Sequence, residues 1–94
     1  MRRTNRLTPR EIQVAALVYN GLTNREIGGA IGTTEQVIKN YLRVVFDKLG
    51  VWSRLELALY IANHGGDQWR DNMLADAAPA GRVRVQSPAE LIAS

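Results

Sequence analysis

Apolar residues recur at helical spacing in three consecutive segments of this chain. An apolar residue at every third or fourth position is typical of a helix with one buried face. The positions that follow this spacing are Val14, Leu17 and Val18 in the first segment, Ile27 and Ile31 in the second, and Ile38, Leu42, Val45 and Leu49 in the third. The pattern therefore predicts three amphipathic helices that share a core.

Each predicted helix begins at a capping residue and ends at a glycine. In a capping box, a Ser or Thr side chain and a Glu three residues later bind backbone N–H groups that the first helical turn leaves free. Capping boxes begin at Thr8, Thr23 and Ser53, and the third helix begins at Thr33 or Thr34. Glycines that can end the helices stand at positions 21, 32, 50 and 65. These boundaries predict four helices joined by short turns, with the spacing of a helix-turn-helix.

The second predicted helix contains two adjacent glycines, Gly28 and Gly29. Each costs up to about 1 kcal/mol of helix stability relative to alanine. We therefore expect a close helix crossing to require at least one of them.

The fourth predicted helix is apolar nearly all round. Leu57 and Ile61 lie on the side opposite to Leu55, Leu59 and Ala62. A helix on the surface of so small a domain cannot bury both sides against one core. We expect one set to face a second copy of the chain, and we assign Leu55, Leu59 and Ala62 to that interface. The alternative is that the C-terminal tail folds back over this face.

The chain after Gly66 has no sustained helical period, which predicts weak order or an extended tail. Two parts of it nevertheless carry helix signals. Residues 68–78 place Trp69, Met73 and Leu74 on one side, and a further capping signature spans residues 87–90.

Composition and charge narrow the possible functions. The 94 residues carry a net charge of +3, and nine of the 12 Lys and Arg lie within residues 1–63, against five of the nine Asp and Glu. This distribution favours a polyanionic partner.

Cysteine is absent, and the single histidine, His64, has no nucleophile or paired carboxylate at a meaningful spacing. We therefore expect no enzyme, no metal and no cofactor. No apolar run approaches the about 20 residues of a membrane span, so we expect a cytoplasmic protein without membrane contact.

Five short motifs in this order resemble the LuxR/GerE-type DNA-binding domain, the output domain of NarL/FixJ-like regulators. They are the runs at residues 7–11, 21–27, 31–35, 48–51 and 53–54. The resemblance implies an all-α fold of four helices with a partly ordered tail. We place a basic arm at residues 1–6, the helix-turn-helix domain at 7–64 and the C-terminal tail at 65–94. The third helix (about 34–49) is expected in the major groove, with the second crossing behind it and the fourth pairing with its copy.

The exposed side of the third helix carries side chains that suit base edges. Gln36, Lys39, Asn40 and Arg43 repeat at intervals of three and four, so they share one face. Arg or Lys can bind guanine, and Asn or Gln can pair with adenine. The resemblance places the base-reading positions on Lys39, Asn40 and Arg43. From the residues alone, a solvated helix surface is the alternative.

Helix N-termini supply the predicted phosphate contacts. They are Thr23, Asn24 and Arg25 on the second helix and Thr34 on the third, and simple capping is the alternative role. Glu35 and Tyr41 complete the predicted DNA-binding set. The family usually has a threonine and a histidine where this chain has Val37 and Tyr41.

Other basic residues have separate expected roles. Arg2, Arg3 and Arg6 form an arm that can touch the DNA backbone or simply keep the terminus solvated. For Arg54 we expect a structural role near Glu11 or Glu56.

Together these features predict a homodimeric bacterial transcription regulator that binds double-stranded DNA. We expect it at the nucleoid in the cytoplasm, and with only six residues before the first motif we expect no sensor domain. The alternative is a helix-turn-helix module that regulates a protein partner without specific DNA binding. The C-terminal tail is a further candidate contact for a protein partner.

Overall fold

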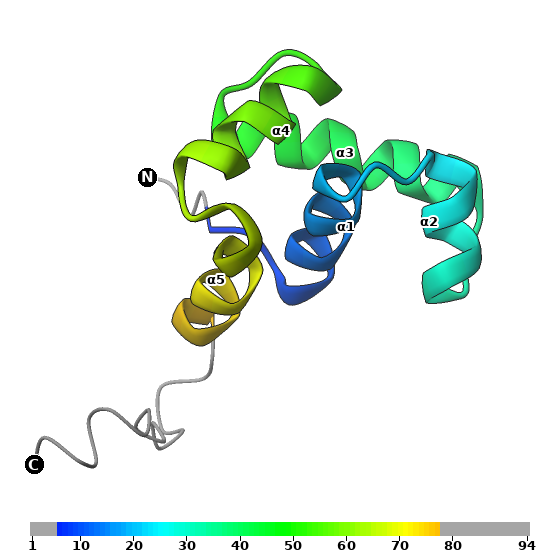
Figure 1. The fold of residues 1–94 in the computed structure, drawn as a ribbon. Helices are drawn as coiled ribbons and strands as arrows, with labels where there is room; N and C mark the ends of the chain where they lie inside the picture. The colour runs from blue at the N-terminus through cyan, green and yellow to red at the C-terminus, as the bar shows by residue number, and fades with distance from the viewer. Residues whose placement is uncertain (1–5, 78–94) are drawn as a thin grey trace, which may run out of the picture.

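The computed structural model describes residues 6–77, and all regular structure within them is helical. The elements are α1 (Pro9–Tyr19), α2 (Asn24–Ile31), α3 (Glu35–Leu49), α4 (Arg54–Asn63), the 3-10 helix η1 (Gly66–Gln68) and α5 (Trp69–Ala77) (Figure 1). The predicted all-α class is therefore confirmed, with a fifth helix added to the expected four. Residues 1–5 of the predicted arm and 78–94 of the predicted tail, including the capping signature at 87–90, lie outside the described residues.

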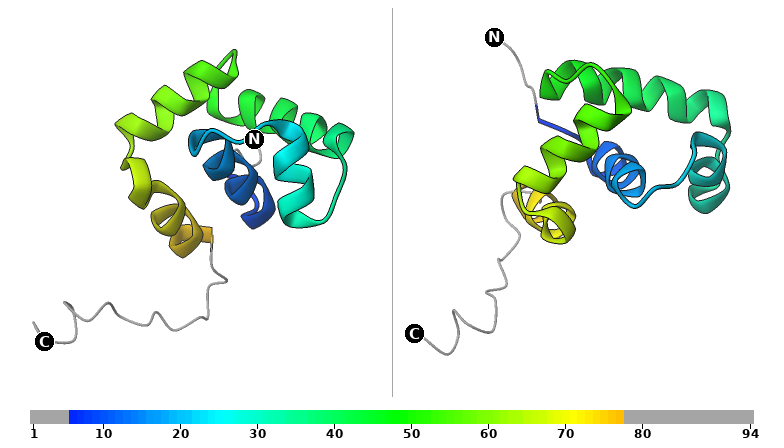
Figure 2. Two further views of the ribbon diagram at one scale, coloured as in Figure 1. Left: turned by 45° about the vertical axis from the view of Figure 1, so that its right-hand side comes forward. Right: turned by 45° about the horizontal axis from the view of Figure 1, so that its top comes forward.

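The first helix, α1, lies at the centre of the fold. It packs against α2, α3, α4 and α5, and the views place α2 on one side of it and α5 on the other (Figures 1 and 2). The longest helix, α3, has 15 residues and packs against both α1 and α2. None of the described helices has the length and apolar character that a membrane crossing needs.

The predicted apolar stripes meet in one core. The buried residues predicted from the spacing are Val14 and Val18 of α1, Ile27 of α2, and Ile38, Leu42 and Val45 of α3. The remaining predicted positions are partly buried and pack against this core: Leu17, Ile31 and Leu49. The helical spacing therefore identified the side of each helix that faces inward.

Helix capping follows the predicted motifs at two of the three boxes. Thr8 and Thr23 form complete capping boxes with the glutamates three residues later. At α4, the Ser53 hydroxyl accepts a hydrogen bond from the Glu56 N–H at 3.1 Å. The Glu56 carboxylate, however, accepts from the Trp52 N–H at 2.6 Å. The third box is thus displaced by one residue, because the glutamate binds the N–H before the capping serine.

Residues after α4 return to the core. Gly65 and Gly66 have φ values of 117° and 55°, which glycine adopts without steric cost, and they turn the chain toward α1. Trp69 is only 2% exposed, and Met73 and Leu74 pack against the same core. The helical alternative is confirmed for residues 69–77, while residue 78 lies outside the described residues.

The far end of α5 is also attached to the start of the domain. The Arg6 guanidinium donates a hydrogen bond to the backbone carbonyl of Asp76 at 3.2 Å. Since α5 packs along α1, the described part of the predicted tail covers α1. It leaves Leu55, Leu59 and Ala62 of α4 exposed.

Candidate nucleic-acid interface

A tight turn sets the position of α3 relative to α2. Gly32 has a φ of 83°, and the backbone N–H groups of Gly32 and Thr33 both donate to the Gly28 carbonyl at 2.9 and 2.8 Å. A Cβ atom on Gly28 would stand 2.8 Å from the Thr33 carbonyl oxygen, whereas one on Gly29 would meet open space. Gly28 is therefore the glycine that needs the space, but the backbone that approaches it is the turn leading into α3 and not a crossing helix.

The two sides of α3 differ sharply in burial. Ile38, Leu42 and Val45 are buried, while the predicted DNA-contacting side chains on the other side are exposed. Those exposed residues are Glu35, Gln36, Lys39, Asn40 and Arg43. The Gln36 Nε2 atom donates to Asn40 Oδ1 at 3.3 Å, so the two amides are aligned along the helix. The fold thus presents one cationic and amide-bearing face to solvent.

Two other predicted DNA contacts of α3, Thr34 and Tyr41, lie at the edge of its exposed face. Thr34 caps α3, and its hydroxyl oxygen accepts a hydrogen bond from the Val37 N–H at 3.2 Å. A hydroxyl that accepts through its oxygen still has its O–H to donate, so capping and a phosphate contact are compatible. Tyr41 is half-buried and packs against the core, which limits the reach of its ring.

The start of α2 holds the remaining predicted phosphate contacts. Thr23 is occupied in its capping box, with its oxygen accepting from the Glu26 N–H at 3.1 Å. Arg25 is exposed. Asn24 Oδ1 accepts a hydrogen bond from the Arg54 guanidinium. Asn24 therefore anchors α2, and the Nδ2 group is the part of its side chain that is chemically suited to a phosphate.

Arg54 has a structural role, but its expected partners were wrong. Its guanidinium binds Asn24 and the Leu22 carbonyl, the latter at 2.6 Å, so it ties the start of α4 to the start of α2. Glu11 instead pairs with Lys48 of α3 at 2.9 Å. The sequence could not show which carboxylate or carbonyl Arg54 binds, because its partners depend on how α4 crosses the other helices.

Two exposed hydrophobic residues near this face were not singled out from the sequence. Val44 of α3 is 40% exposed, and Trp52, between α3 and α4, is 87% exposed. Both border an open groove at the end of α3, which Arg43, Asp47 and Val51 also line. The exposure of Val44 could have been predicted from its place four residues after Asn40, because that spacing puts it on the exposed side of the helix.

The faces of α4 are divided as predicted between core and solvent. Leu57 and Ile61 are buried in the core. Leu55, Leu59 and Ala62 are exposed on the other side. The assignment of the second set to a dimer interface stays a prediction.

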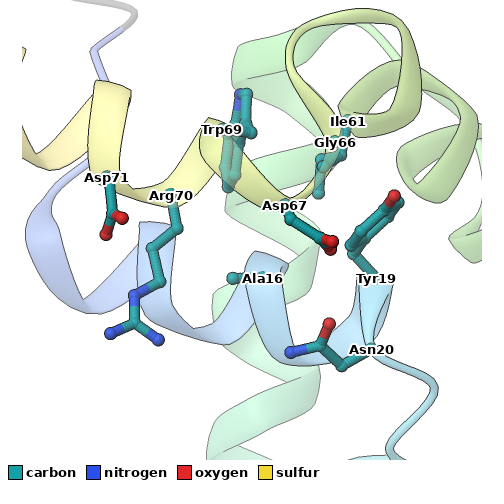
Figure 3. A pocket seen from close by; sticks show the side chains of 9 residues that line it. All are labelled: Ala16, Tyr19, Asn20, Ile61, Gly66, Asp67, Trp69, Arg70 and Asp71. Carbon is teal, nitrogen blue, oxygen red and sulfur yellow. The ribbon is translucent and has the colours of Figure 1, made fainter.

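A separate pocket of about 260 Å³ lies away from α2 and α3. Its lining residues come from α1, α4, η1 and α5, and the side chains of Tyr19, Asn20 and Asp67 border the same hollow (Figure 3). Because no residue of α3 lines it, this pocket is not part of the candidate interface.

Comparison with known proteins identifies a family and related regulators. Residues 5–61 match the family described as bacterial regulatory proteins, luxR family. Over 54 residues the chain is 43% identical to the HTH-type transcriptional regulator MalT of Serratia proteamaculans (strain 568). The match covers 57% of this chain but only 6% of that relative. No solved structure matches the chain at a significant level.

Proposed function

This chain belongs to the LuxR family of bacterial regulatory proteins, and on that premise we propose that it regulates transcription as a homodimer bound to double-stranded DNA. The family is one of regulators and not of enzymes. In this proposal α3 lies in the major groove, and the protein acts at the nucleoid in the cytoplasm.

The observation that carries the proposal is the exposed face of α3. Lys39, Asn40 and Arg43 are exposed on a helix whose opposite side is fixed in the core. An α-helix fits the major groove, where guanine offers two acceptors to Arg or Lys and adenine offers an acceptor and a donor to Asn or Gln. In this proposal Arg25 and Thr34, at the N-termini of α2 and α3, contact phosphates at the groove edge.

Arg43→Ala should relax sequence discrimination at one base position and weaken binding to the preferred duplex. A good Arg–guanine pair discriminates by about 1–3 kcal/mol, which is roughly a 5- to 150-fold change in affinity. The measurement is in-vitro selection of duplexes at physiological salt, followed by binding titrations. The matched control is Arg10→Ala, which removes the same charge from an exposed α1 residue that lies beside α5.

An unchanged base profile in Arg43→Ala would contradict the groove assignment. Salt dependence provides an independent check, because about five phosphate contacts predict a loss of affinity of roughly 10²- to 10³-fold between 50 and 200 mM salt. A flat salt response would favour the alternative, a module that binds a protein partner.

Support for a dimer comes from the exposed face of α4. Leu55 and Leu59 are two of the large hydrophobic residues that remain exposed in the described part of the chain, and a second copy of α4 would cover both of them. A two-fold dimer of this kind would read two related half-sites about 10 base pairs apart.

Leu59→Asp should produce a monomer that binds its operator much more weakly, because a charge would be buried at the centre of the interface. Sedimentation on and off DNA measures the oligomeric state. Ala75→Asp, which adds the same charge at an exposed position of α5, serves as the control. A wild-type protein that is already monomeric on its operator would refute the dimer.

A further inference from the structure

The exposed face of α3 contains one hydrophobic residue that capping and core packing do not explain. Val44 is 40% exposed, although the apolar stripe of α3 is satisfied by Ile38, Leu42 and Val45 on the other side. The other large hydrophobic residues exposed in the described part of the chain lie outside α3, at Trp52, Leu55 and Leu59. Val44 is thus an apolar side chain within the proposed base-reading surface.

Helical geometry places Val44 beside the predicted base contacts. It follows Asn40 by four residues, a spacing that brings Cβ atoms to within about 6 Å on one face. Arg43 and Asp47, its other neighbours on this side, are exposed. Val37, two turns earlier, is half-buried, so an apolar edge runs along α3 next to the amides of Gln36 and Asn40.

The chemistry of valine restricts what can lie against this position in a major groove. The side chain can neither donate nor accept a hydrogen bond, so a polar base edge packed against it would lose its partner in water. The 5-methyl group of thymine is the apolar feature of the major groove, and small apolar side chains contact it. Asn40 is suited to adenine, so an A·T-rich step would satisfy both residues.

We propose that Val44 recognises the 5-methyl group of a thymine next to the base pair read by Asn40, and so determines part of the operator sequence. The inference rests on the proposed function, since it requires α3 in the major groove. A protein partner is the less favoured occupant of the same groove, because the charged residues Arg43 and Asp47 line it together with Val44.

The test combines a change in the protein with the removal of one methyl group from the DNA. Starting from the selected duplex, each thymine is replaced singly by deoxyuridine, which keeps base pairing and lacks the methyl group. For the wild-type protein, one replacement per half-site should weaken binding about three- to fivefold. This is the affinity that the burial of one methyl group contributes. In Val44→Ala, binding should be weaker and sensitivity to that replacement should disappear.

Two further variants make the assignment specific to Val44. Asn40→Ala should retain the deoxyuridine effect, because it changes a different contact. Val37→Ala should retain it as well, since Val37 lies two turns away. Circular dichroism of each variant checks that the fold is intact. We expect an intact fold in Val44→Ala, because Val44 is exposed.

The outcomes separate this inference from the proposed function. Duplex binding that is indifferent to every deoxyuridine replacement would overturn the role of Val44 while leaving DNA binding in place. A deoxyuridine effect that persists in Val44→Ala, or disappears in Val37→Ala, would also overturn it. Failure to bind any duplex at low salt would overturn both the inference and the proposed function.

Discussion

Replacement of Trp69 with alanine should lower the free energy of unfolding by about 3–5 kcal/mol, the range for removing a large aromatic side chain from a core. Trp69 is 2% exposed and packs with the residues of α1 and α4 that form the centre of the domain. For a domain of this size the expected fall in Tm is roughly 12–40 °C. Thermal and urea unfolding followed by circular dichroism measure both quantities.

The second tryptophan of the chain provides a matched control. Trp52 is 87% exposed, so Trp52→Ala should change the free energy of unfolding by less than about 0.5 kcal/mol. Each variant retains one of the two tryptophans, and fluorescence then reports the buried or the exposed indole separately. A loss of unfolding free energy in Trp69→Ala that is as small as the loss in Trp52→Ala would show that α5 does not belong to the folding unit. The predicted domain end at residue 64 would then be supported.

A buried ion pair connects the start of α1 with the end of α3. Glu11 is 7% exposed, and its Oε1 atom accepts hydrogen bonds from the Thr8 N–H and from Lys48 Nζ, both at 2.9 Å. Lys48 Nζ also donates to the Arg6 carbonyl at 3.0 Å. One carboxylate oxygen therefore serves both the helix cap and the contact with α3.

Loss of either charge in this pair should be strongly destabilising. Lys48→Met leaves a buried carboxylate without its cation, and Glu11→Gln leaves the ammonium without its anion. Each should cost about 3 kcal/mol of stability, near the lower end for a buried pair because the Lys48 side chain is still 19% exposed. The double variant should be less destabilised than the sum of the two, because neither charge then lacks a partner. Urea unfolding of all four proteins gives the coupling free energy.

The control for the helix cap is Glu26→Gln in the exposed capping box of α2. It changes the same kind of cap without a buried ion pair, so we expect a loss of no more than about 1 kcal/mol. Additive effects of Glu11→Gln and Lys48→Met would show that the two charges are not coupled in the folded state.

The sequence predicted which polar side chains of α3 are exposed, but not the exposed hydrophobic residue beside them. Gln36, Lys39, Asn40 and Arg43 lie on the solvent side because the helical period fixes their direction relative to Ile38. Their contacts with bases stay predictions. Val44 was not recognised in advance, because it directly precedes Val45 of the core stripe, although its place four residues after Asn40 already put it on the exposed side.

The long-range contacts could not be predicted in the same way. The partners of Arg54 are Asn24 and the Leu22 carbonyl, 30 and 32 residues away. The partner of Glu11 lies 37 residues away. A charged side chain in a sequence has several equally suitable partners, and only the crossing of the helices selects one.

Local chemistry alone determined the helices α1 to α4 and their inward faces, because capping hydrogen bonds and helical spacing act over three or four residues. Tertiary structure decided the placement of α5, the burial of Trp69, the need for glycine at position 28 and the choice of ion-pair partners. Each of these depends on surfaces distant in the chain coming together. The short apolar side of α5, made of Trp69, Met73 and Leu74, is positioned by the packing of α5 against α1.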